Sequence, residues 1–255
     1  MKSISSSSYK KFTLECCVDS VESALLAEKG GADRLELCSN LIIGGTTPTL
    51  ALFRQIREHT DIRIHVLLRP RFGDFLYTKQ ELQIIAKEIC LFREAGAEGI
   101  VIGCLSPDGS LDCEAMRFLI NQSGQMSVTL HRAFDMSKDP FHTLELAKEL
   151  GIQTILTSGC QASCADSIDL LRQLDEKADG QLTIMAGAGI GESTVKLLLE
   201  QTGLTAFHMS GKRIKNSGML FRNPNVSMGL PGMSEYEIWE TDANAVAAVK
   251  KLLSE

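Results

Sequence analysis

Short apolar runs recur along the chain, and each is followed by a stretch of helical periodicity. The runs are rich in β-branched and long aliphatic side chains and occupy residues 12–17, 34–38, 64–68, 99–103, 127–130, 154–156, 182–185 and 206–209. Their centres lie roughly 28 residues apart, which is the length of a strand, a crossover helix and two short loops. The pattern therefore predicts a strand–helix unit repeated eight times.

The segments between the runs carry the start and stop signals of helices. Residues 19–22 and 78–81 have the capping-box pattern, in which the first and last side chains of a helical turn bond each other's backbone N–H groups. Gly96 is placed to end the second of these helices, because glycine adopts the backbone conformation that terminates a helix. A final helix is expected over residues 242–253.

Strands that are apolar on both faces and alternate with helices require a parallel sheet. Eight such units close most simply into a barrel, so we predict an α/β protein with a single (β/α)8 TIM barrel of parallel strands. An open doubly wound sheet is the alternative. It fits less well because the glycine-rich turn 187–189 follows the seventh run and not the first. We expect the barrel to span residues 11–255, after a flexible N-terminal tail of residues 1–10, with residues 211–236 as a long loop after the eighth strand.

Composition and charge are those of an ordinary globular protein, with 44% hydrophobic and 23% charged residues and a formal net charge of −6. This balance offers no general field for nucleic acid or an anionic membrane. No stretch reaches the roughly 18 uninterrupted apolar residues of a membrane span, and the N-terminal residues lack the apolar region of a secretory signal. We therefore expect a cytoplasmic protein that binds neither nucleic acid nor membranes, with its cysteines as buried thiols or metal ligands.

Polar side chains end the first two apolar runs, at the end of the barrel where the carboxyl ends of the strands meet. Side chains in a strand alternate between its faces, so Glu15 shares a face with Cys17, and Glu36 shares a face with Cys38. Neighbouring strands lie about 4.8 Å apart. The sequence therefore predicts a cluster of two carboxylates and two thiols at the mouth of the barrel.

Cationic and hydrogen-bonding side chains end the third, fifth, sixth and eighth runs. Buried charges persist only in pairs, so we expect Glu15 and Glu36 to face Arg69 and Arg132. One hypothesis is an enzyme that acts on a small anionic or sugar-like metabolite. Its candidate acid–base residues are Glu15, Glu36, His131 and Asp135, and its candidate ligand-binding residues are Arg69, Arg71, Arg132, Ser158, His208 and Ser210. For any single member, a purely architectural role is the alternative.

Two other features carry weaker signals. The turn 187–190 and residues 210–212 occupy the place where many barrels bind phosphate through backbone N–H groups, but Glu192 would repel that anion. His65 stands near the start of the third run, so we expect it at the opposite end of the barrel as a packing or surface residue.

Several segments at the predicted strand ends resemble the signature segments of the CutC family of copper-homeostasis proteins. These are residues 14–20 (LECCVDS), 31–38 (GADRLELC), 44–48 (GGTTP), 69–77 (RPRFGDFLY), 131–135 (HRAFD) and 156–159 (LTSG). The resemblance extends from about residue 12 to 228. Its segment 217–223 (SGMLFRN) is similar to the longer, animal-type members. Cys16, Ala188, Met209 and Gly211 depart from the family's pattern.

The resemblance implies a TIM barrel, a cytoplasmic homo-oligomer such as a dimer or tetramer, and a role in copper homeostasis. It places the family's proposed Cu(I) cysteines at Cys17 and Cys38. Cu(I) is a soft ion that accepts two thiolates, whereas zinc asks for four ligands. Copper, as Cu(I), is therefore the expected metal, and no organic cofactor is predicted. The two carboxylates are poor ligands for Cu(I), so the enzyme hypothesis with a small anionic ligand stays open.

Overall fold

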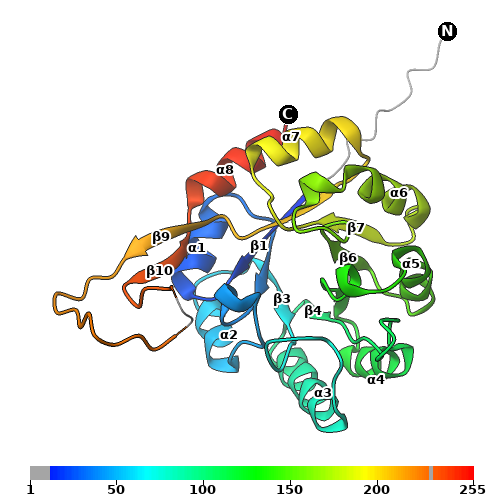
Figure 1. The fold of residues 1–255 in the computed structure, drawn as a ribbon, viewed down its shortest axis with the longest axis horizontal. Coiled ribbons are helices and arrows are strands. Elements are labelled where there is room, and N and C mark those ends of the chain that lie inside the picture. The colour runs from blue at the N-terminus through cyan, green and yellow to red at the C-terminus, as the bar shows by residue number, and fades with distance from the viewer. Residues whose placement is uncertain (1–11, 230–231) are drawn as a thin grey trace.

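The computed structural model describes residues 12–229 and 232–255 and contains a closed barrel of eight parallel strands (Figure 1). The strands neighbour one another in chain order, and β1 pairs with β8 to complete the ring. They are β1 (Thr13–Val18), β2 (Arg34–Leu37), β3 (Arg63–Leu67), β4 (Gly99–Ile102), β5 (Ser127–Leu130), β6 (Thr154–Thr157), β7 (Thr183–Ala186) and β8 (Ala206–Met209). The predicted TIM barrel is confirmed. The predicted tail of residues 1–10 lies outside the described residues.

Helices follow the strands and surround the barrel (Figure 1). They are α1 (Val21–Lys29), α2 (Leu50–Arg57), α3 (Lys79–Glu94), α4 (Cys113–Ser123), α5 (Pro140–Glu149), α6 (Ile168–Ala178), α7 (Glu192–Gln201) and α8 (Ala243–Leu252), with 3₁₀ turns at Leu41–Ile43, Phe134–Met136 and Cys164–Asp166. The capping box of Thr78 and Glu81 begins α3 as predicted. At α1 the cap is Ser20, which accepts the Ser23 N–H, so that helix begins one residue later than predicted. Within the described residues, no helix is long and apolar enough to cross a bilayer.

The strands alternate between a helix-facing side and a barrel-facing side. In β1, Leu14, Cys16 and Val18 belong to the large hydrophobic cluster that joins the strands to the helices, whereas Glu15 and Cys17 belong to the other face. This outer layer is the main core of the protein. The predicted shared face of Glu15 and Cys17 follows directly from the alternation.

The barrel interior is unusually polar for this fold, whose interiors are mostly filled by branched aliphatic side chains. Two small apolar clusters lie apart from the main core: Cys38, Leu67 and Val101, and Leu156, Met185 and Ala206. Buried Glu15, Arg34 and His65 occupy the same face of their strands. His65 is therefore a packing residue in the barrel interior and not a surface residue; it lies at the middle of β3, level with Glu36 on the neighbouring strand. Burial lowers the pKa of His65 to about 4.

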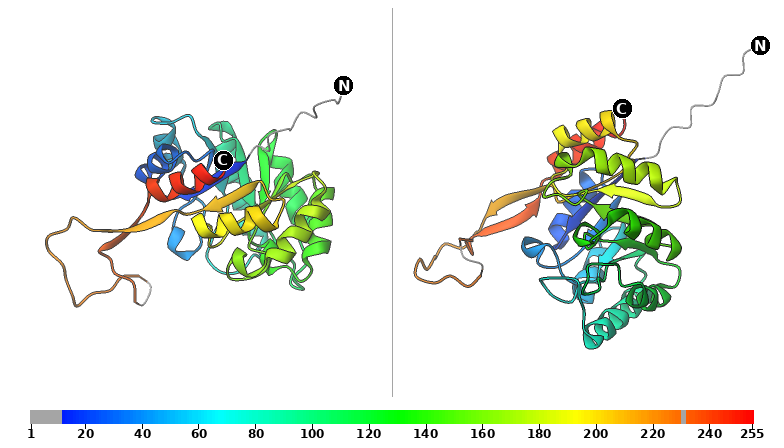
Figure 2. Two further views of the ribbon diagram at one scale, coloured as in Figure 1. Left: turned by 90° about the horizontal axis from the view of Figure 1, so that it is seen from above. Right: turned by 45° about the vertical axis from the view of Figure 1, so that its right-hand side comes forward.

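A hairpin arm, described over residues 212–229 and 232–241, projects from the barrel between β8 and α8 (Figure 2). It contains two antiparallel strands, β9 (Lys212–Asn216) and β10 (Glu237–Thr241), with Ile214 opposite Trp239. The prediction of a long loop over residues 211–236 is therefore wrong at its start, because residues 212–216 form the strand β9. Among its described residues, the arm exposes seven large apolar side chains: Ile214, Met219, Leu220, Phe221, Val226, Met228 and Ile238.

Candidate functional site

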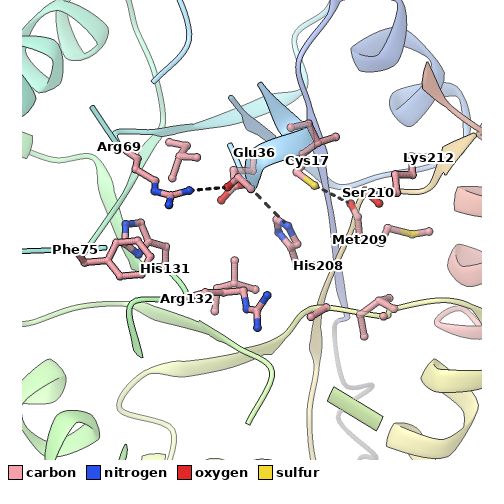
Figure 3. A pocket seen from close by; sticks show the side chains of 17 residues that line it. Cys17, Glu36, Arg69, Phe75, His131, Arg132, His208, Met209, Ser210 and Lys212 are labelled. Carbon is pink, nitrogen blue, oxygen red and sulfur yellow. Dashed lines mark hydrogen bonds and ion pairs between the residues drawn. The ribbon is translucent and has the colours of Figure 1, made fainter. Parts of the chain in front are cut away.

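The mouth of the barrel holds a cavity of about 420 Å³ (Figure 3). Its wall is built by residues at the carboxyl ends of the strands and in the loops that follow them. The polar side chains that line it include Cys17, Glu36, Arg69, His131, Arg132 and His208. The barrel thus brings together residues that are widely separated in sequence, as predicted from the strand-end pattern.

Three potential metal ligands meet on one side of this cavity. One ligand atom each from Cys17, Glu36 and His208 lies within 4.8 Å of the other two. Cys17 and Glu36 are opposite each other on β1 and β2, and His208 Nε2 lies 3.9 Å from a Glu36 carboxylate oxygen. The Cys17 thiol donates to the Met209 carbonyl oxygen at 3.7 Å. Thiol, imidazole and carboxylate together form a possible ligand set for a metal ion.

A buried ion pair lies directly beneath this group. Glu15 is completely buried, and its carboxylate accepts a hydrogen bond from Arg34 Nε at 2.5 Å and contacts His208 Nδ1 at 2.7 Å. Burial alone would raise the pKa of Glu15, but the Arg34 charge and the His208 hydrogen bond hold it well below its usual range. Because Glu15 binds Nδ1, the other ring nitrogen of His208 is turned towards Glu36.

The pKa of Glu36, the second buried carboxyl group, is shifted in the opposite direction to that of Glu15. Burial raises the pKa of Glu36 to about 7, helped by the Glu15 charge and opposed by His208. Burial would lower the pKa of His208, but the facing Cys17 and Glu36 groups raise it well above its ordinary value. Burial therefore favours the protonated form of Glu36, whereas the Arg34 charge favours the ionised form of Glu15.

Cys38 and Glu36 both point to the barrel-facing side of β2, but Cys38 does not line the cavity. It is fully buried, its thiol donates to the Val18 carbonyl oxygen at 3.5 Å, and it packs with Leu67 and Val101. Burial raises the pKa of its thiol well above the ordinary value. Cys38 is therefore not among the residues that line the cavity in this structure, and its predicted role as a metal ligand stays a prediction.

The predicted ion pairs of Arg69 and Arg132 with the buried glutamates do not form among the described residues. Arg69 is held by main-chain carbonyl groups, and Arg132 pairs with Asp135 at 2.7 Å. Glu15 pairs instead with Arg34, which lies level with it on the adjacent strand. Arg69 and Arg132 follow the ends of their strands, so loop groups are their nearest partners.

Asp135 and Ser158 form a separate network behind the cavity wall. Asp135 accepts hydrogen bonds from the Thr157 hydroxyl, from both the N–H and the hydroxyl of Ser158, and from the Cys160 N–H. Its acceptor capacity is used in fixing the loop after β6. Of the four acid–base candidates, only Glu36 and His131 line the cavity.

The remaining candidates divide between the mouth and the surface. Ser210 lines the cavity, as do His208 and Lys212. Arg71 lies outside it and pairs with Asp74 and Glu81 at the start of α3. Arg34 is a buried interior residue that the strand-end pattern does not indicate.

Comparison with known proteins decides the family. The model of the CutC family matches residues 12–213. The chain belongs to the CutC family. The copper homeostasis protein cutC homologs of Homo sapiens and Mus musculus are each 42% identical to it over 242 residues, covering 94% of this chain and 89% of theirs. A CutC structure from Streptococcus agalactiae superimposes with a TM-score of 0.75 at 27% identity, covering 78% of this chain and 98% of that one. The predicted family is confirmed.

Proposed function

We propose that this CutC protein acts in copper homeostasis by binding copper, as Cu(I), at the barrel mouth, with the Cys17 thiolate and His208 Nε2 as ligands. The convergence of Cys17, Glu36 and His208 within 4.8 Å carries the proposal. Thiolate sulfur is the ligand type that selects Cu(I), and imidazole also suits copper. The names of the human and mouse relatives supply the choice of copper.

The residues present fit a soft metal ion in a partly closed site. Cys17 is 6% exposed and lines the cavity, so an ion can reach it while most of its surroundings exclude water. Glu15 orients His208 from behind, as carboxylates commonly do for metal-binding histidines. Glu36 is a hard ligand that contributes little to Cu(I) binding but would serve Zn²⁺.

Replacing Cys17 by Ser is expected to weaken Cu(I) binding by about 100-fold or more, because loss of even an outer partner of a ligand costs about 10–100-fold. Affinity is measured anaerobically by competition with the chromophoric chelator bicinchoninate. Cys90→Ser, at a half-buried cysteine on α3, is the matched control and should bind normally.

Two further variants identify the second ligand. His208→Gln should weaken Cu(I) binding if Nε2 is a ligand, whereas Cys38→Ser should do so only if the Cys38 thiol turns from the Val18 carbonyl towards the ion. Unchanged Cu(I) affinity in Cys17→Ser contradicts the proposed site. Tighter binding of Zn²⁺ than of Cu(I) at the same three residues contradicts the choice of metal.

The second candidate function is an enzyme that acts on a small anionic metabolite, and Glu36 favours it. A carboxyl with a pKa of about 7 at the mouth of a TIM barrel is suited to act as a general acid or base at neutral pH. This function requires an organic ligand in the cavity and the copper function does not, so ligand binding separates them.

The chain is also proposed to form a homo-oligomer through the hairpin arm. An isolated two-stranded hairpin is only marginally stable, and this one exposes large apolar side chains such as Phe221 and Met228. Sedimentation velocity of a chain with residues 217–236 replaced by a short Gly-Ser loop is expected to show smaller particles than the full chain. Equal sedimentation of the two chains contradicts a role for the arm.

A further inference from the structure

His131 lines the mouth cavity and carries a buried hydrogen-bond donor that has no acceptor among the described residues. His131 is 4% exposed, and its Nδ1 accepts the Ala133 N–H at 3.1 Å. The proton of the neutral ring must therefore reside on Nε2. Within residues 12–229 and 232–255, Nε2 has no hydrogen-bond partner. Burying a donor without an acceptor is unfavourable, so this N–H requires an acceptor.

Arg69 also lines the cavity and carries a second buried donor, and no carboxylate pairs with its charge in the described part of the chain. Its Nη1 donates to the Gly45 carbonyl at 3.1 Å and its Nη2 to the Gly73 carbonyl at 2.7 Å, while its Nε has no partner in the described part of the chain. Arg69 as a whole is 8% exposed, and the partners of its guanidinium among the described residues are carbonyl groups, with no carboxylate among them. A buried cation bound only by neutral dipoles attracts an anion.

The two donors belong to one structural unit. The Phe75 ring lies 4.8 Å from the His131 ring, centroid to centroid, and 5.2 Å from Arg69 Cζ. Figure 3 shows these three side chains together on the side of the cavity away from Cys17. Burial and the Arg69 charge lower the pKa of His131 to about 3, which keeps the ring a neutral donor.

We propose that this wall is a binding site for the carboxylate of a small organic acid, with His131 Nε2 and Arg69 Nε as the hydrogen-bond donors. Two free donors and one positive charge match a group with two oxygens and one negative charge. A phosphate group has more charge and more acceptors than this wall satisfies. Leu67 and Leu156 line the same cavity and suit a short carbon chain. The site does not depend on copper.

The decisive experiment observes the His131 side chain directly in the metal-free, full-length protein. Long-range ¹H–¹⁵N spectra of ¹⁵N-histidine-labelled protein are recorded during titration with sodium acetate and sodium propionate. The His131 Nε2 signal is expected to shift and saturate with either carboxylate. Sodium phosphate and sodium chloride at equal ionic strength are expected to leave it in place. Because this measurement uses the wild-type chain, it does not depend on whether a variant folds.

Variants then locate the donor. His131→Phe keeps an aromatic ring beside Phe75 but removes the N–H, and is expected to weaken propionate binding by about 10-fold, the loss of one charge-assisted hydrogen bond. His131→Gln retains an N–H group and should restore part of the affinity. His142→Phe, at an exposed histidine on α5, is the matched control and should bind normally.

The outcomes separate this site from the copper site. Propionate binding should persist in Cys17→Ser, because Cys17 lies on the opposite side of the cavity (Figure 3). A His131 Nε2 signal that does not shift on addition of either carboxylate overturns the proposal. A shift that chloride reproduces, or a stronger response to phosphate than to propionate, also overturns it, since the first is only an effect of salt and the second identifies another ligand class.

Discussion

Replacing Arg34 by Met is expected to lower the free energy of unfolding by about 3–5 kcal/mol, because removing one partner of a buried ion pair leaves the other charge uncompensated. Glu15 is completely buried and Arg34 is 9% exposed, and the pair is direct at 2.5 Å. The remaining contact of Glu15, with His208, does not remove the cost of burying a carboxylate in the barrel. Urea unfolding at neutral pH, followed by circular dichroism, measures the loss.

A matched control and a double variant test the cause. Arg172→Met removes an exposed pair with Asp169 on α6 and should cost less than about 1 kcal/mol. Glu15→Gln combined with Arg34→Met removes both charges, and should recover most of the lost stability because a neutral replacement of a buried pair is often tolerated. A cost for Arg34→Met no larger than that of Arg172→Met would contradict the role assigned to the pair.

The position of the pair explains its presence in a barrel interior. Glu15 lies between Arg34 and His208, so the same carboxylate that neutralises the arginine also fixes the imidazole. Without that contact, His208 could rotate its Nε2 away from Cys17 and Glu36. A wholly apolar interior, the common arrangement in this fold, would leave the imidazole without this support.

The strands are predictable from the sequence because they are buried on both faces. A parallel strand enclosed by a barrel and by helices reads as a short apolar run, so the run 206–209 coincides with β8 (Ala206–Met209) and the run 12–17 lies within one residue of β1 (Thr13–Val18). The hairpin arm lacks this signal. β9 is fully exposed and rich in charge, and it pairs with β10 some twenty residues later.

The sequence indicates which residues belong to the candidate site more readily than which of them contact each other. Cys17, Glu36 and His208 all stand out as polar strand ends, but β1 contacts β8 only because the barrel closes. Closure places His208 level with Glu15, a contact that no local pattern encodes. Arg34 is the first residue of an apolar run, so from the sequence it resembles a surface residue at the start of a strand. Its role becomes clear only from the strand pairing, which places Glu15 level with it on the adjacent strand.

Acidification is expected to destabilise the wild-type protein through His131, and His131→Phe should remove that contribution. The folded-state pKa of His131 is about 3, because of burial and the Arg69 charge, against an ordinary value of about 6.5. As the pH falls below 6.5, the unfolded chain gains a proton that the folded protein does not, so the free energy of unfolding decreases by about 1.4 kcal/mol per pH unit. Between pH 7 and pH 4.5 this loss amounts to about 2.5 kcal/mol.

The stability difference between wild type and His131→Phe isolates this effect from other titrating groups, including Glu36, whose raised pKa acts in the opposite direction. Urea unfolding at several pH values should show the variant gaining about 2.5 kcal/mol relative to wild type on going from pH 7 to pH 4.5. His142→Phe, at an exposed site, should show no such gain. A constant difference between wild type and His131→Phe would mean that the His131 ring takes up a proton in the folded protein, and so cannot be the neutral hydrogen-bond donor of the proposed carboxylate site.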